Sequence, residues 1–134
     1  MAVQKLTANQ VRKIEAIEGY QKVVVHARAL VAELEGNRAA KQSYLNNISG
    51  MIAREMQQMR QRMLTAPIGT VGDLAGNLAV MAGRSSGLQV KLRGLHDGLN
   101  SIDMQLDVAL KAAMQPEKEH EKEKPAGTPP AAQG

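Results

Sequence analysis

Apolar residues recur along the chain at alternating intervals of three and four, the spacing that places side chains on one face of an α-helix. One such run covers about residues 8–64 and is clearest from residue 45 onward. Thr7 or Asn9 can cap its start, because either side chain can accept hydrogen bonds from free backbone N–H groups. The second run covers about residues 71–114 and is the more regular. The two stripes consist of Leu45, Ile48, Ile52, Met56, Met59 and Met63, and of Leu74, Leu78, Met81, Ser85, Leu88, Leu92, Leu95, Leu99, Ile102, Leu106 and Leu110.

A turn at residues 65–70 separates the two runs, since Pro67 has no N–H to continue a helix and disfavours helical backbone before it. Within the first run we expect a bend or a break near Gly36 and Asn37. The sequence therefore predicts an all-α protein, an elongated helical hairpin of two long helices over residues 1–114. Residues 115–134 are first charged and then rich in proline and alanine, a composition typical of a flexible tail.

Six glycines recur in the second run with a period of 11 residues. This period keeps them in one narrow stripe, roughly 140° around the helix from the leucine stripe. They lower helix stability by about 5 kcal/mol in total, so close approach of another backbone must offset that cost. We leave open whether this backbone is peptide or phosphate, because Arg84 and Lys91 flank the stripe and Arg93 lies further round. The predicted close-packing face consists of Gly72, Gly76, Gly83, Gly87, Gly94 and Gly98.

The amino-acid composition affects which residues we expect in the core and leaves the predicted helices unchanged. The chain has no Cys, Phe or Trp and only two Tyr. A core of Ala, Val, Leu, Ile and Met suits long helices packed side by side, and we expect a partner chain to complete it. The absence of Cys excludes disulfides and thiolate metal sites. The sequence begins without the apolar core of a signal peptide and holds no segment apolar enough to span a membrane.

Positive charge is concentrated in the middle of the chain, whose formal net charge is +4. Residues 37–62 contain a single acid, Glu55, and many Asn, Gln and Ser side chains. Such residues contact phosphate and sugar oxygens without reading base sequence, although a solvated polar face is the plain alternative. The absence of aromatic stacking platforms favours a duplex over a single strand. The basic residues of this segment are Arg38, Lys41, Arg54, Arg60 and Arg62.

Catalytic and metal-binding patterns are absent from the sequence. His26, His96 and His120 are scattered, and no nucleophile, phosphate-loop or dinucleotide motif is present. We therefore predict a non-enzymatic protein with no cofactor and no metal. The eight Met residues fit helix packing or an adaptable subunit interface.

A basic helical hairpin that lacks Cys, Phe and Trp, with a glycine-lined helix and a Pro/Ala tail, resembles the major capsid proteins of filamentous archaeal viruses of the tristromavirus type. In that family, paired helical subunits wrap double-stranded DNA inside an enveloped filament. The resemblance covers about residues 8–114 and implies a location in the virion, with the cytoplasm as the alternative. Carried over by position, it implies phosphate contacts from Arg38, Lys41, Arg54, Arg60, Arg62, Arg84, Lys91 and Arg93.

Two functions follow as hypotheses. The first is a structural nucleoprotein or capsid subunit that oligomerises, with itself or a related subunit, into a helical filament around double-stranded DNA. The second is a coiled-coil scaffold or adaptor, such as a filament or secretion-stalk subunit, that binds only protein. Strong salt dependence of duplex binding distinguishes the first from the second.

Overall fold

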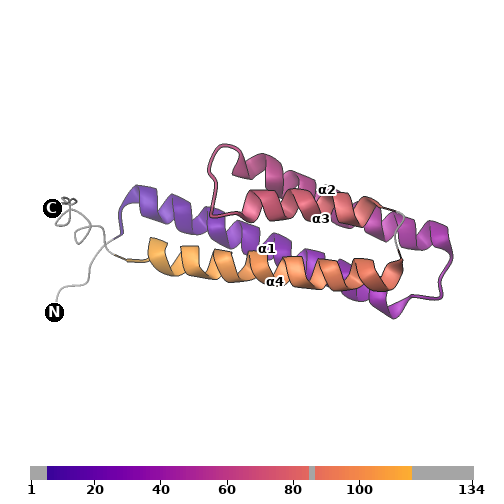
Figure 1. Ribbon diagram of the computed structural model, residues 1–134. Coiled ribbons are helices and arrows are strands. Elements are labelled where there is room, and N and C mark those ends of the chain that lie inside the picture. The colour runs from indigo at the N-terminus through magenta and orange to yellow at the C-terminus, as the bar shows by residue number, and fades with distance from the viewer. Residues whose placement is uncertain (1–5, 85–86, 116–134) are drawn as a thin grey trace.

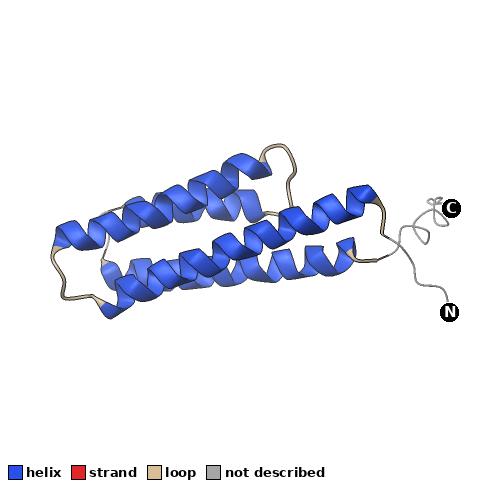
Figure 2. Ribbon diagram, turned by 180° about the vertical axis from the view of Figure 1, so that it is seen from behind, coloured by secondary structure: helices blue, strands red, loops and turns tan. Residues whose placement is uncertain are grey.

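The computed structural model describes residues 6–84 and 87–115, and the elements within these ranges are all α-helical (Figures 1 and 2). This confirms the predicted fold class. The predicted hairpin of two long helices is wrong, because each long helix is broken into two and the four pieces form a bundle. The helices are α1 (Ala8–Gly36), α2 (Gln42–Met63), α3 (Val71–Gly83) and α4 (Leu88–Ala113).

The two breaks have a common physical reason. The first follows Gly36, where the sequence indicates a bend or a break, and the second follows Gly83. Glycine is a poor helix former at both places. Folding back at these points brings the apolar stripes of both helical runs into one interior, and that burial outweighs the lost helical hydrogen bonds.

The helices run alternately up and down, and both described ends of the chain lie at the same end of the bundle (Figure 1). α1 and α3 each contact α2 and α4, so α1 lies diagonally opposite α3. α1 and α4 are the longer pair and extend past the turn that joins α2 to α3 (Figure 1). None of the described helices is long and apolar enough to cross a membrane.

The core is built from side chains of all four helices. Tyr20 is its only aromatic residue, and α2 contributes Met56, Met59 and Met63 beside Ile52. The described helices close this core within one chain. The aromatic-poor composition therefore does not require a partner chain to complete it.

Gln10 joins the two ends of the described chain. Thr7 caps α1 with a reciprocal pair of hydrogen bonds: Gln10 N donates to Thr7 Oγ1 at 3.1 Å, and Thr7 N donates to Gln10 Oε1 at 2.9 Å. Gln10 Nε2 also donates to the carbonyl oxygen of Ala113 at 3.2 Å and to that of Gln115. One buried amide thus satisfies free backbone groups at the start of α1 and at the end of α4.

Polar contacts from α1 reach both of its neighbours. Each lies at the edge of the core, where exposure limits its contribution to stability. The Tyr44 hydroxyl donates to Glu33 Oε2 at 2.6 Å, and this hydrogen bond raises the pKa of the Tyr44 phenol. The other contacts are His26 with Glu55 at 3.3 Å, Arg28 with Asp103 at 3.5 Å and His96 with Glu35 at 3.2 Å.

Candidate nucleic-acid interface on the α2–α3 hairpin

Four of the repeated glycines receive side chains from a neighbouring helix of the same chain. A Cβ at Gly72 would lie 3.0 Å from Met63 Cβ, and one at Gly76 would lie 2.8 Å from Arg60 Cδ, so both α3 glycines face α2. On α4, a Cβ at Gly98 would lie 2.9 Å from Leu78 Cγ. These glycines therefore admit side chains of α2 and α3, rather than a peptide or phosphate backbone from outside.

Gly94 belongs to the same group, since a Cβ there would lie 2.8 Å from Met81 Cε. Gly83 and Gly87 differ, because no atom lies within 4 Å of a Cβ built at either. Gly83 ends α3 and Gly87 precedes α4. The predicted single stripe is thus divided between two helices that run in opposite directions.

The Arg60 side chain lies across the outer surface of α3 at Gly76, where the absence of a side chain leaves room for it. Its aliphatic stem crosses that glycine, and the same hollow is lined by Gln57 from α2 and by Asp73 and Asn77 from α3. Sequence reasoning missed Asn77, which lies next to Gly76. Asp73, Gly76, Asn77 and Val80 are spaced by one, three or four residues, which places them on one face of a helix. This spacing could have indicated that Asn77 lies beside Gly76 and Arg60.

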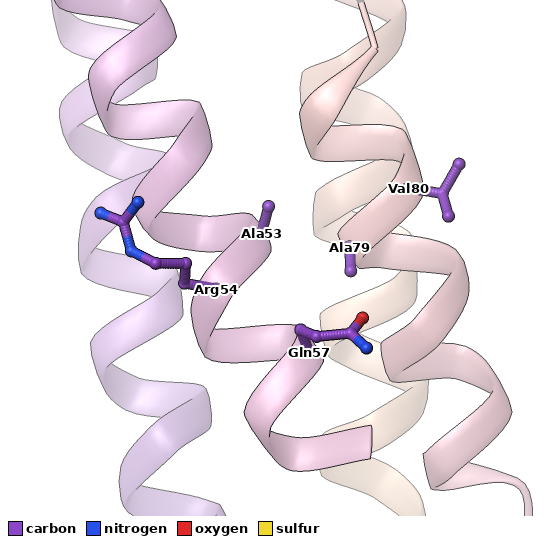
Figure 3. A pocket seen from close by; sticks show the side chains of 5 residues that line it. All are labelled: Ala53, Arg54, Gln57, Ala79 and Val80. Carbon is purple, nitrogen blue, oxygen red and sulfur yellow. The ribbon is translucent and has the colours of Figure 1, made fainter. Parts of the chain in front are cut away.

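A second hollow continues the groove between α2 and α3. Figure 3 shows Gln57 reaching from α2 toward Ala79 and Val80 on α3, while Arg54 points away from α3. Ala53 and Ala79 keep the two helices close together there. The groove is therefore lined by the small residues Ala53 and Ala79 and by the amides of Gln57 and Asn77, with Arg60 beside Gln57.

The net positive charge of the described residues lies on the α2–α3 hairpin and its two connections. Residues 37–84 hold six basic and two acidic side chains, a net charge of +4. Residues 6–36 hold four of each sign and residues 87–115 hold three of each sign, so both are neutral. Of the two hairpin acids, Glu55 is paired with His26 of α1. The face of α2 turned away from the core therefore presents arginines and amides without an acid.

Seven of the eight basic residues named from the sequence are exposed, and Lys91 is buried. Arg38 pairs with Glu35 at 3.8 Å, before α2 begins, and Lys41 is the N-cap of α2. Arg93 lies on α4, away from the hairpin. On the hairpin itself, Arg54, Arg60 and Arg62 lie along α2, and Arg84 is the C-cap of α3.

Lys91 is 6% exposed in the first turn of α4. Burial lowers the pKa of its ammonium group from the ordinary value of 10.5. None of the other described residues forms an ion pair or a side-chain hydrogen bond with it. This burial does not favour the phosphate contact that the sequence suggested for Lys91.

Replacing Lys91 with methionine is expected to raise the free energy of unfolding by about 1 kcal/mol at pH 7, because a partly desolvated charge is removed. With a lowered pKa in the folded state, the unfolded chain binds more protons between that pKa and 10.5. Stability of the unmodified protein should therefore rise with pH across this window, and the Lys91→Met variant should lose the rise. Urea denaturation at pH 7 to 10.5, with exposed Lys22→Met as the control, checks both effects.

Among the described residues, no group of three or more His, Asp or Glu side chains could hold a metal ion. The chemistry available at the α2–α3 surface is hydrogen bonding and charge pairing with an anion. No family model, no curated protein and no solved structure matches this chain.

Proposed function

We propose that this protein is a non-catalytic structural protein that binds the phosphate backbone of double-stranded DNA through its α2–α3 hairpin, without reading base sequence. The segregation of charge carries the proposal: residues 37–84 have a net charge of +4 beside two neutral helices. Backbone binding of a duplex depends mainly on such clustered cations.

The amide side chains around the arginines support the same ligand, whereas the Asp73 carboxylate, which lines the same hollow as Arg60, opposes it. Gln57 and Asn77 beside Arg60, and Gln58 and Gln61 on the exposed face of α2, are hydrogen-bond donors that suit phosphate and sugar oxygens. Arginine pairs with phosphate through two parallel hydrogen bonds, and this geometry adds to the charge interaction.

The hairpin lacks the features of a single-strand binder. Its only aromatic side chain is Tyr44, whose hydroxyl donates to Glu33 at the α1 side. Bases of single strands stack on several exposed aromatic platforms, whereas Tyr44, 39% exposed, is the single aromatic on the described surface of α2 and α3. A duplex, contacted through its backbone, therefore fits the surface better.

Salt dependence of binding tests this function. With phosphate contacts from six basic residues, affinity for a 30-base-pair duplex should fall on the order of a thousandfold between about 50 and 200 mM salt. Fluorescence anisotropy with two duplexes of unrelated sequence measures this fall and should give the same affinity for both. No binding at 50 mM salt, or binding that hardly changes with salt, would contradict the proposal.

The assembled state is proposed on the basis of the resemblance to filamentous archaeal virus capsids. On that basis the protein is a subunit of a helical filament around DNA, located in a virion. Electron micrographs of the purified protein with and without duplex should show regular filaments only when DNA is present. Isolated particles in both samples would contradict a capsid role and leave duplex binding to be judged by its salt dependence.

A scaffold that binds only protein is the second candidate. Exposed apolar side chains on α4 favour it, because Val90, Met104 and Val108 remain 70%, 67% and 63% exposed. Single exposed apolar residues are common on protein surfaces, whereas a contiguous group of them marks a site that a partner protein can cover. Assembly that proceeds without DNA and ignores salt would support this candidate over the first.

A further inference from the structure

The bundle consists of two helical hairpins joined by two short connections. α2 packs against α3 and α1 packs against α4, and residues 37–41 and 84–87 connect the two pairs. The ends of α1 and α3 and the starts of α2 and α4 all lie at the same end of the bundle (Figure 1). One hairpin can therefore swing away from the other without disturbing the contacts inside either.

The apolar pattern of α3 passes into α4 without a change of register. Met81 and Leu88 are seven residues apart, which is two helical turns, and no proline lies between them. α3 ends and α4 begins at residues with extended backbone, with φ −81° and ψ 155° at Arg84 and φ −59° and ψ 140° at Gly87. Since a Cβ at Gly83 or Gly87 would touch nothing within 4 Å, packing does not impose glycine at either position.

Residue counts show that an opened chain can keep both hairpins. Contacts pair Glu35 with His96 and Arg60 with Gly76. Glu35 and Arg60 are 25 residues apart along α1 and α2, whereas Gly76 and His96 are 20 residues apart along α3 and α4. The surplus of five residues equals the length of the connection at 37–41. One continuous helix through α3 and α4 is therefore compatible with both pairings when residues 37–41 loop out.

We infer that two copies of this chain exchange their α2–α3 hairpins to form a dimer. In the exchanged dimer α3 and α4 of each chain join into one helix, and the α2–α3 hairpin of each copy packs on α1 and α4 of the other. The contacts of α1 with α2 and of α3 with α4 are rebuilt between chains. Because the packing is the same in both forms, the connections and the protein concentration decide which one forms. This inference concerns the bundle alone and does not depend on DNA binding.

Substitutions at Gly87 alter the balance between the two forms. A φ of −59° suits proline in the closed monomer, whereas proline inside a continuous helix is strongly disfavoured. Gly87→Pro should therefore abolish the dimer. Gly87→Ala favours the helical connection about fivefold per chain, so the dimerisation constant should rise about 25-fold. Size-exclusion chromatography with light scattering, at about 10 μM to 1 mM protein, measures both effects.

Engineered disulfides distinguish exchange from ordinary association, since the chain has no native Cys. The pair Leu78→Cys with Gly98→Cys bridges α3 and α4, whose contact is rebuilt between chains by exchange. The control pair Met63→Cys with Gly72→Cys bridges α2 and α3, which stay together in either form. After oxidation of the isolated dimer, the first pair should give covalent dimers on a non-reducing gel, and the control pair should give single chains.

Three results would overturn the inference. The first is that the wild-type protein and the Gly87→Ala variant both stay monomeric at about 1 mM. The second is a dimer in which both disulfide pairs form within single chains, and the third is a dimer that persists in Gly87→Pro. Either of these last two indicates association of closed bundles. The Gly87 variants keep the test valid if Leu78→Cys disrupts the core.

Discussion

Replacing Gly98 with leucine should lower the free energy of unfolding by about 3 kcal/mol or more. A Cβ at this position would already lie 2.9 Å from both Cγ and Cδ1 of Leu78. Leu78 is 3% exposed, so it has no solvent-filled space into which to move. The added side chain must therefore separate α4 from α3 or displace the core. Urea denaturation followed by circular dichroism measures the loss.

Gly83→Leu is the matched control, because Gly83 belongs to the same sequence repeat. A Cβ there meets nothing within 4 Å, and the residue is exposed at the end of α3. Its substitution should change stability by less than about 0.5 kcal/mol. Equal losses at Gly83 and Gly98 would contradict the conclusion that the glycines receive side chains of a neighbouring helix.

The outer limits of the helices could be predicted because local chemistry determines them. Thr7 caps the first helix, and Pro67 lies in the turn that ends the first helical run and precedes the second. The interruption between Gly83 and Leu88 could not be predicted, since the apolar spacing continues across it. That break depends on tertiary packing, which is stronger than local helix propensity here.

Two features of the candidate site show how far local sequence patterns predict the packing of the helices. The glycine period predicted close approach, but only the pairing of helices shows that Arg60 and Leu78 fill the space. Lys91 lies three residues after Leu88 and four before Leu95, at the edge of the leucine stripe, and it is buried. The helical spacing therefore indicated its burial, and only its charge suggested a surface position.

Removing two arginines from the exposed surface of α2 should weaken duplex binding much more than removing two lysines elsewhere. Each phosphate contact contributes about eightfold to affinity at 0.1 M salt, so Arg54→Gln with Arg62→Gln should lower the affinity about sixtyfold. The slope of log affinity against log salt should become shallower by about 1.8. Both arginines are exposed, so the fold should be unaffected.

The central claim, that the α2–α3 hairpin is the surface that binds the duplex, is tested most directly by comparing this variant with Lys22→Gln and Lys111→Gln. Lys22 is exposed on α1, and Lys111 is exposed on α4, where it pairs with Asp107 at 3.2 Å. Both double variants lose two positive charges. Anisotropy titrations at 0.1 M salt should give about a sixtyfold loss for the arginine variant and less than about a threefold loss for the lysine variant. Equal losses in the two would mean that net charge alone attracts DNA, and would contradict a binding surface on the hairpin.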